Sequence, residues 1–293
     1  LAAECTAKRM YPDYISAKKM RESYEGNVFS PMGCRSFLSP WKDENGNYKF
    51  DGRFNMGVVS LNLPQIGILA DGDEEKFFQI LHKRLELCKK ALLLRVELLK
   101  KITSDVSPIH WQYGAISRLK PGESIEKFMY GGYATLSLGY IGMYEATLLT
   151  KGVSHTTPEG KRFAHRIMDD LNEHIKKWRE ETNIGFALYG TPAESLTHRF
   201  CQKDRSRFGN IKDVTDKGYY TNSYHVDVRE PINVFDKFAF ESEFEDKSTG
   251  GCISYAEIPN MTHNVPAILT MIEYIYDHIS YGEFNTKLDY CHE

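Results

Sequence analysis

The sequence lacks an excess of charge of either sign, and it lacks any long apolar run. Lysine and arginine number 37 and aspartate and glutamate 40, so the net charge of -3 provides no basic footprint for a nucleic acid. The longest unbroken aliphatic stretch, Ala91 to Leu94, is far too short to cross a bilayer. We therefore expect a protein that binds neither nucleic acid nor membrane.

Closely spaced cysteines are also missing. The six cysteines are dispersed, with no short spacing that indicates a disulfide framework or a C-x-x-C metal pair. Residues 1–20 are charged and polar, unlike a signal peptide. These features predict a reducing, cytoplasmic compartment, in which most cysteines are small apolar core residues.

What is present is the composition of a folded domain. Of the 293 residues, 41% are hydrophobic and 13% aromatic, which predicts a large, well-filled core and excludes disorder. The sequence starts at Leu1 without a methionine and stops at Glu293 without a polar tail. We expect it to be a piece of a longer chain, forming one domain or part of one.

Hydrophobic periodicity predicts strands that alternate with long helices, which is typical of a largely parallel α/β architecture. Amphipathic helices with one apolar stripe are expected over 73–102 and 158–182. Residues 25–53 read as an irregular but aromatic-rich, ordered segment. The remaining expected helices cover 8–21, 124–149 (interrupted by glycines), 193–201 and a segment from Pro266, and the expected strands cover 56–61, 184–188 and 252–256.

A short loop around Cys34 is the first candidate for chemistry. Pro31 removes a backbone donor and Gly33 permits unusual backbone angles, so the thiol is expected in a tight turn. The neighbouring Arg35 could favour a thiolate, but no histidine lies within twenty residues. Locally, the pattern leaves open a buried structural cysteine and a reactive one.

Two further segments are ambiguous by themselves. Asn55 precedes an apolar strand, where an amide can bind a hydroxyl or, more commonly, cap a turn. The 188–195 segment is a strand, a turn and a helix start, which suits an anion but also matches an ordinary cap with Thr191, Pro192 and Glu194. His155, His165 and His174 show no metal-ligand spacing.

Several blocks together resemble the anaerobic (class III) ribonucleoside triphosphate reductases, and they follow the family's order over nearly the whole chain. The blocks are SPMGCRSFL at 30–38, RFNMGVVSLNLP at 53–64, YGTPAES at 189–195, YTNSYHV at 220–226 and GGC at 250–252. The resemblance implies part of a ten-stranded α/β barrel, with a central loop that carries the active-site cysteine.

The resemblance also implies roles for individual residues. Cys34 matches the cysteine that a glycyl radical oxidises to a thiyl, which then abstracts the 3′ hydrogen of the ribonucleotide. Met32 matches a methionine near that cysteine. Ser36, two residues beyond Cys34, is expected to bind the substrate. Asn55 matches the asparagine that binds the ribose hydroxyls. Thr191 and Ser195 match the phosphate site, with Glu194 expected in the helix cap.

Other parts of the family's pattern are missing from residues 1–293. These are the N-terminal ATP cone, the N-terminal half of the barrel and the C-terminal glycyl-radical segment. Cys291 resembles the first of four zinc cysteines, and the other three are absent. We expect a single catalytic-barrel fragment that does not turn over alone.

The resemblance further implies formate, or a thiol system, as reductant and ATP or deoxynucleotide effectors. It implies a radical-SAM iron–sulfur activating enzyme and a homodimer. Two alternatives stay open: another glycyl-radical enzyme, formate-lyase-like or dehydratase-like, and a non-catalytic nucleotide-binding subunit of a split enzyme.

Overall fold

The computed structural model describes residues 1–32, 35–190 and 193–285. Its larger sheet consists of three parallel strands in the order of the sequence. They are β2 (Phe54–Asn62), β3 (Ala134–Ile141) and β4 (Gly185–Tyr189). All eight residues of β3 are buried, as expected for the central strand of a parallel sheet covered on both faces.

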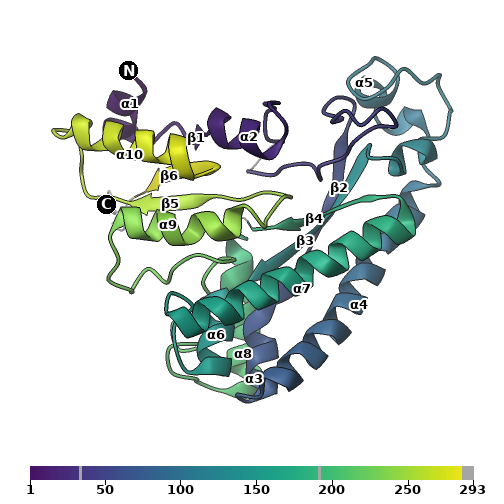
Figure 1. Ribbon diagram of the computed structural model, residues 1–293. Coiled ribbons are helices and arrows are strands. Elements are labelled where there is room, and N and C mark those ends of the chain that lie inside the picture. The colour runs from purple at the N-terminus through teal and green to yellow at the C-terminus, as the bar shows by residue number, and fades with distance from the viewer. Residues whose placement is uncertain (33–34, 191–192, 286–293) are drawn as a thin grey trace, which may run out of the picture.

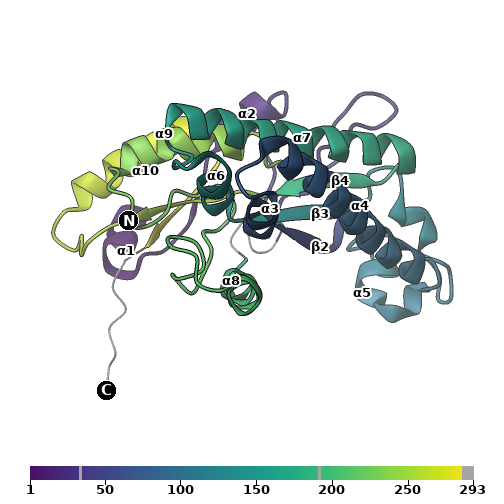
Figure 2. The ribbon, with the colours of Figure 1, turned by 90° about the horizontal axis from the view of Figure 1, so that it is seen from below.

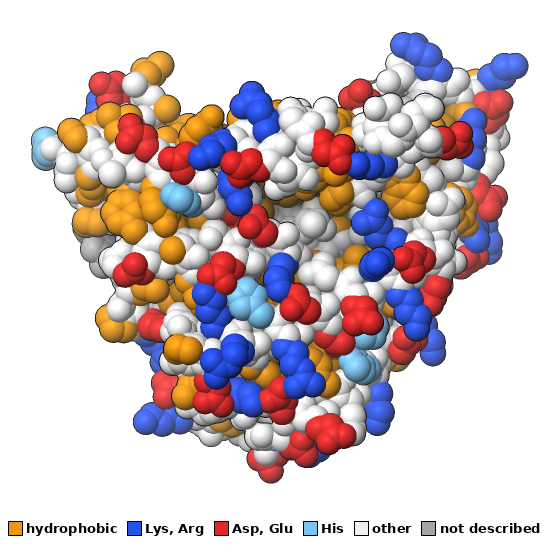
Figure 3. All heavy atoms as spheres, in the orientation of Figure 1, with side chains coloured by type: hydrophobic (Ala, Val, Ile, Leu, Met, Phe, Trp, Pro, Cys, Tyr) orange, Lys and Arg blue, Asp and Glu red, His pale blue; other side chains and the backbone are white. Residues whose placement is uncertain are grey.

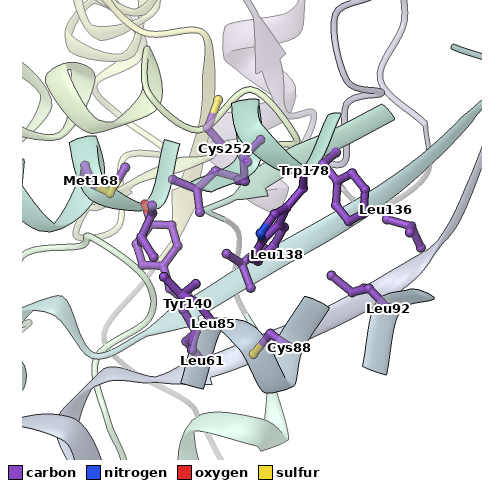
Figure 4. Close-up of a cluster of buried hydrophobic side chains, with 14 of the residues drawn as sticks. Leu61, Leu85, Cys88, Leu92, Leu136, Leu138, Tyr140, Met168, Trp178 and Cys252 are labelled. Atoms are coloured by element: carbon purple, nitrogen blue, oxygen red, sulfur yellow. The ribbon is translucent and has the colours of Figure 1, made fainter. Parts of the chain in front are cut away.

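Two long helices follow one face of this sheet, α4 (Glu74–Leu99) on β2 and α7 (Pro158–Thr182) on β4 (Figure 1). Shorter helices connect them to the strands: α3 (Leu63–Ala70) and α6 (Met143–Lys151). The apolar stripes of both long helices are buried against the strands. Figure 4 shows Leu85, Cys88 and Leu92 of α4 beside Leu136 and Leu138 of β3 and Trp178 of α7.

A smaller sheet has the order β1-β6-β5, with β5 and β6 parallel and β1 antiparallel to β6. It packs with α1, α9 and α10 around a second apolar core, α2 contacts α10, and Figure 2 shows α9 and α10 beside one another near this sheet. The elements are β1 (Tyr14–Ile15), β5 (Ser254–Glu257), β6 (Tyr281–Asn285), α1 (Ala2–Arg9), α2 (Ala17–Ser23), α9 (Val234–Glu245) and α10 (Val265–His278).

The two sheets meet where β4 ends and β5 is about to begin. Gly190 forms a parallel bridge with Cys252, and its N–H donates to the carbonyl of Gly251 at 2.8 Å. The N–H of Gly250 donates to the carbonyl of Leu188 at 2.7 Å. A Cβ on Gly250 would lie 2.8 Å from the Cβ of Ala187, so the close approach requires glycine here.

The remaining helices are α5 (Pro108–Trp111) and α8 (Ser195–Phe208), with 3₁₀ turns at Ser104–Val106 and Glu126–Met129. None of the described helices is both long and apolar enough to span a membrane. Acidic and basic side chains are interspersed over the face shown in Figure 3.

Two sequence predictions of secondary structure are wrong. The helix expected over 8–21 is split, because α1 ends at Arg9 and β1 pairs with β6 before α2 begins. The helical region expected over 124–149 contains the strand β3, since a strand buried on both faces has no alternating pattern. The α/β class is confirmed. The ten-stranded barrel stays a prediction, since the described residues form two three-stranded sheets.

Candidate functional site

The loop predicted to carry the reactive cysteine is closed by its own backbone. The N–H of Met32 donates to the carbonyl of Ser36 at 2.7 Å, which holds these two residues beside one another. Gly33 and Cys34 lie outside the described residues. Ser36 pairs with Gly251 in an antiparallel bridge, and the N–H of Phe37 donates to the carbonyl of Gly250 at 2.9 Å. Ser36 and Phe37 are therefore anchored at the junction of the two sheets.

The positive charge of Arg35 is compensated by two neighbouring carboxylates. It adopts the left-handed conformation, with φ of 59°, and its guanidinium forms an ion pair with Glu283 of β6. A second carboxylate, that of Asp13, lies 3.8 Å away. Burial raises the pKa of Glu283 although Arg35 acts to lower it. The prediction that Arg35 favours a thiolate at Cys34 has less support, because Glu283 and Asp13 already compensate the charge of Arg35.

Asn55 lies at a bulge near the start of β2, where the pairing with β3 shifts by one residue. Its Nδ2 donates to Ser137 Oγ at 3.0 Å, and its Oδ1 accepts the N–H of Gly57 at 2.6 Å. The amide thus caps the bulge of its own strand. It is half-buried and retains one donor and one acceptor position for a ligand.

The strand–turn–helix segment after β4 is held by Asn222. The N–H of Ala193 donates to Asn222 Oδ1 at 3.1 Å, and α8 begins two residues later at Ser195, which is exposed. Thr191 and Pro192 lie outside the described residues. Glu194 is the N-cap residue by position, but its side chain makes no capping bond, so the predicted capping role for this side chain is wrong.

A cavity of about 350 Å³ lies beside the start of α8. One wall comes from α8 and the segment between α8 and α9, and the other from β5 and β6. Glu283, the partner of Arg35, lies on the second wall. The lining residues include Thr197, Tyr219, Asn222, His225, Tyr255 and Glu283.

A buried ionic cluster that the sequence did not reveal fixes the first wall. The Nζ of Lys217 lies 2.5 Å from carboxylate oxygens of both Glu145 and Asp227, and its side chain is 3% exposed. Glu145 also accepts hydrogen bonds from the N–H and hydroxyl of Thr221, both at 2.8 Å. Burial opposes ionisation of Asp227, yet Arg229 and Lys217 lower its pKa to about 2.

The three histidines noted in the sequence have different polar partners. His155 is fully buried, with Nε2 2.9 Å from the carbonyl of Tyr224, and burial lowers its pKa. His165 pairs with Glu243, and His174 lies beside Asp170.

Asn55 and Ser195 are not brought together within the described part of the chain. The strand register aligns Asn55 with Thr135 and Gly185, at the start of β4. Ser195 follows the opposite end of that strand. At about 3.3 Å per residue, the distance from Gly185 to Gly190 alone is about 17 Å. A ligand that touched both residues would have to extend along the strand.

Comparison with known proteins gives a consistent result. A family model described as anaerobic ribonucleoside-triphosphate reductase matches residues 1–293. The anaerobic ribonucleoside-triphosphate reductase of Enterobacteria phage T4 is 44% identical over 297 residues, which is 99% of this chain and 48% of that protein. The enzyme of the same name from Escherichia coli K12 is 42% identical, over 100% of this chain and 41% of its own length. The chain therefore spans less than half the length of these relatives.

The fold is also shared with a solved structure. The crystal structure of the anaerobic ribonucleotide reductase from Thermotoga maritima in complex with dATP and CTP aligns with a TM-score of 0.71. The alignment covers 99% of this chain and 45% of that one at 22% sequence identity. At this identity, the likeness supports the fold alone.

Proposed function

The chain belongs to the anaerobic ribonucleoside-triphosphate reductase family, and we propose that it supplies the radical cysteine and one side of the substrate site of such an enzyme. The reaction is the anaerobic reduction of ribonucleoside triphosphates to deoxyribonucleoside triphosphates. The single observation that carries the proposal is the Arg35–Glu283 ion pair, which joins the segment around Cys34 to the cavity that α8 lines.

The chemistry assigned to this chain begins at Cys34. A glycyl radical, whose residue is not among residues 1–293, would oxidise Cys34 by taking the hydrogen atom of its thiol. Cys34 as a thiyl would take the 3′ hydrogen atom of the ribose; the 2′ hydroxyl, once protonated, would then leave as water, and formate, oxidised to carbon dioxide, would supply the two electrons of the reduction. Because a thiyl is quenched by stray hydrogen donors, its loop must be held in one position. The backbone bonds of Met32 and Ser36 and the Arg35–Glu283 ion pair support such a fixed position.

The substrate would be oriented by neutral groups near the radical. Asn55 orients the ribose hydroxyls with a donor and an acceptor that carry no charge. Met32 and Ser36 flank the cysteine on either side. Thr191 and Ser195 bind the phosphates, where the backbone N–H groups at the start of α8 provide a partial positive charge.

We propose that this chain acts with the partners and cofactors of its family, which lie outside the described residues. They are a radical-SAM activating enzyme, a second copy of the chain, formate as reductant and nucleotide effectors in an N-terminal region. Cys291, which also lies outside the described residues, is proposed as the first of four zinc cysteines. We propose a cytoplasmic protein in which residues 1–293 form one catalytic-barrel fragment.

Of the two alternatives, a formate-lyase-like or dehydratase-like enzyme has little support, because the curated relatives at 42–44% identity are reductases. A non-catalytic nucleotide-binding part of a split enzyme is compatible with a chain that spans less than half of its relatives. The reductase proposal and the split-enzyme alternative differ in whether Cys34 is needed for turnover.

The test is an anaerobic assay of deoxycytidine triphosphate formation from cytidine triphosphate. Residues 1–293 alone should give no product. The protein completed with the segments of its relatives, activating enzyme and formate should be active, and Cys34→Ser should abolish turnover while the glycyl-radical signal in electron paramagnetic resonance persists. Cys5→Ser, at an exposed cysteine, is the matched control. Turnover by Cys34→Ser would refute the assignment.

A further inference from the structure

The helices α4 and α7 run side by side in the same direction, and their paired residues follow the same order. Phe77 contacts Phe163 near their starts, and Lys89 forms an ion pair with Glu181 further along. Between these two contacts, His82 of α4 faces one turn of α7. Figure 3 shows histidine side chains at the surface over this helix pair.

Three potential metal ligands meet at this point. The Nε2 of His82 lies 2.9 Å from each carboxylate oxygen of Asp170. The Nδ1 of His174, one turn further along α7, lies 3.6 Å from Asp170 Oδ1. Ligand atoms of the three residues all lie within 4.8 Å of one another. The His82 side chain is 50% exposed, whereas those of Asp170 and His174 are 17% and 22% exposed.

The donor set selects among cations. Mg²⁺ and Ca²⁺ are bound by oxygen ligands, whereas two imidazoles and one carboxylate are typical of a zinc site that keeps one position for water. With zinc–ligand bonds of about 2.1 Å, tetrahedral ligand atoms are about 3.4 Å apart, so small side-chain rotations suffice here. The Nδ1 of His174 also lies 2.9 Å from the carbonyl of Asp170. Coordination through Nδ1, the ring nitrogen beside the Asp170 carboxylate, would replace this hydrogen bond.

We propose that His82, Asp170 and His174 bind one first-row transition ion, with Zn²⁺ as the expected occupant, and that the ion links α4 to α7. The site is separate from the cavity beside α8, because none of its residues lines that cavity. It also needs no cysteine. Its role is therefore structural: an ion held by both helices stabilises the layer that covers the β2–β3–β4 sheet.

The experiment uses the full chain after dialysis against a chelator, titrated with Co²⁺ and then with Zn²⁺. We expect visible d–d bands of tetrahedral cobalt without the charge-transfer band of a thiolate ligand. His82→Gln and His174→Gln should each weaken binding roughly tenfold or more. His165→Gln is the matched control, because His165 lies on the same helix beside one carboxylate but without a second histidine, and it should bind as the unsubstituted chain does.

Stability provides an independent measurement. Zn²⁺ should raise the melting temperature of the unsubstituted chain and of His165→Gln, but not that of His82→Gln. His82 is half exposed, so its replacement should leave the metal-free melting temperature and the far-ultraviolet circular dichroism unchanged; His82→Asn is the second variant if it does not. Unchanged cobalt affinity in the folded His82 variant, or a thiolate charge-transfer band that accounts for all bound cobalt, would overturn the proposal.

Discussion

Arg35 and Glu283 form an ion pair across 248 positions of sequence, and it ties the turn around Cys34 to strand β6. Both side chains are shielded, at 25% and 18% exposure. Because Glu283 also lines the cavity beside α8, the same carboxylate contacts the loop and borders the proposed substrate site.

Replacing Glu283 by Gln should destabilise this junction. The variant keeps the shape of the side chain but leaves Arg35 with Asp13, at 3.8 Å, as its one ion-pair partner among the described residues. We expect a loss of about 1–3 kcal/mol in the free energy of unfolding, measured by urea titration. Glu97→Gln removes an exposed ion pair with Lys100 and should cost less than about 1 kcal/mol. Equal losses in the free energy of unfolding for the two variants would show that the Arg35–Glu283 pair contributes no more to stability than an exposed pair.

Lys217→Met should have a larger effect. It removes the cation shared by Glu145 and Asp227, which are 0% and 2% exposed, and leaves two carboxylates buried in close proximity. Loss of one partner from a buried pair costs about 3–5 kcal/mol. Lys89→Met, at the more exposed pair with Glu181, is the control. A urea midpoint for Lys217→Met close to that of the control would contradict the prediction.

Glu245 should make stability depend on pH. Burial raises the pKa of this carboxyl to about 8. The folded chain therefore keeps the proton in a range where the unfolded chain, with a glutamate pKa of about 4.3, has lost it. The contribution is fully present below about pH 4 and is lost as the pH rises through about 8.

Glu245→Gln tests this dependence, because Gln can still accept the N–H of Ser280, which Glu245 Oε2 accepts at 2.7 Å. Urea unfolding between about pH 5 and pH 8 should show a flatter pH profile for the variant than for the unsubstituted chain. Parallel profiles would mean that Glu245 ionises normally in the folded state.

Variants of Asn55 and Ser137 distinguish a residue that binds the substrate from a residue that positions the binding side chain. In the completed enzyme, Asn55→Ala should lower kcat by about 100-fold or more, because the ribose hydroxyls lose their orienting amide. Ser137→Ala removes only the acceptor of Asn55 Nδ2, so it should lower kcat by about tenfold or less. Steady-state kinetics would separate the effects on kcat and KM. A Ser137 variant as impaired as the Asn55 variant would point to a role of Ser137 at the substrate.

Local sequence signals were sufficient for the elements with strong periodicity. The helix expected over 158–182 has those bounds as α7, and the strand expected over 56–61 lies within β2. Local signals were insufficient for β3, whose residues are buried on both sides. The helix α9 and the strand β6 were not predicted at all. Burial on two faces removes the contrast between polar and apolar positions on which periodicity depends.

The site was predictable only in parts. The turn that Pro31 and Gly33 predict falls at Gly33 and Cys34, outside the described residues, and it stays a prediction beside the hydrogen bond between Met32 and Ser36. The contacts between Arg35 and Glu283 and between Lys217 and Glu145 join residues far apart in sequence, so no local pattern could indicate them. For the same reason His174 showed no ligand spacing, since His82 belongs to another helix.

The pairing of β1 with β6 also determines the order in which this protein can fold. Tyr14 lies opposite Gly282, so the smaller sheet cannot form until more than 260 intervening residues are available. The β2–β3–β4 sheet uses only residues 54–189 and can form earlier, while the chain is still being synthesised. Until residue 282 emerges from the ribosome, residues 14–15 lack their partner in β6, and the β1–β6 pairing is the slower step because it is the least local strand pairing among the described residues.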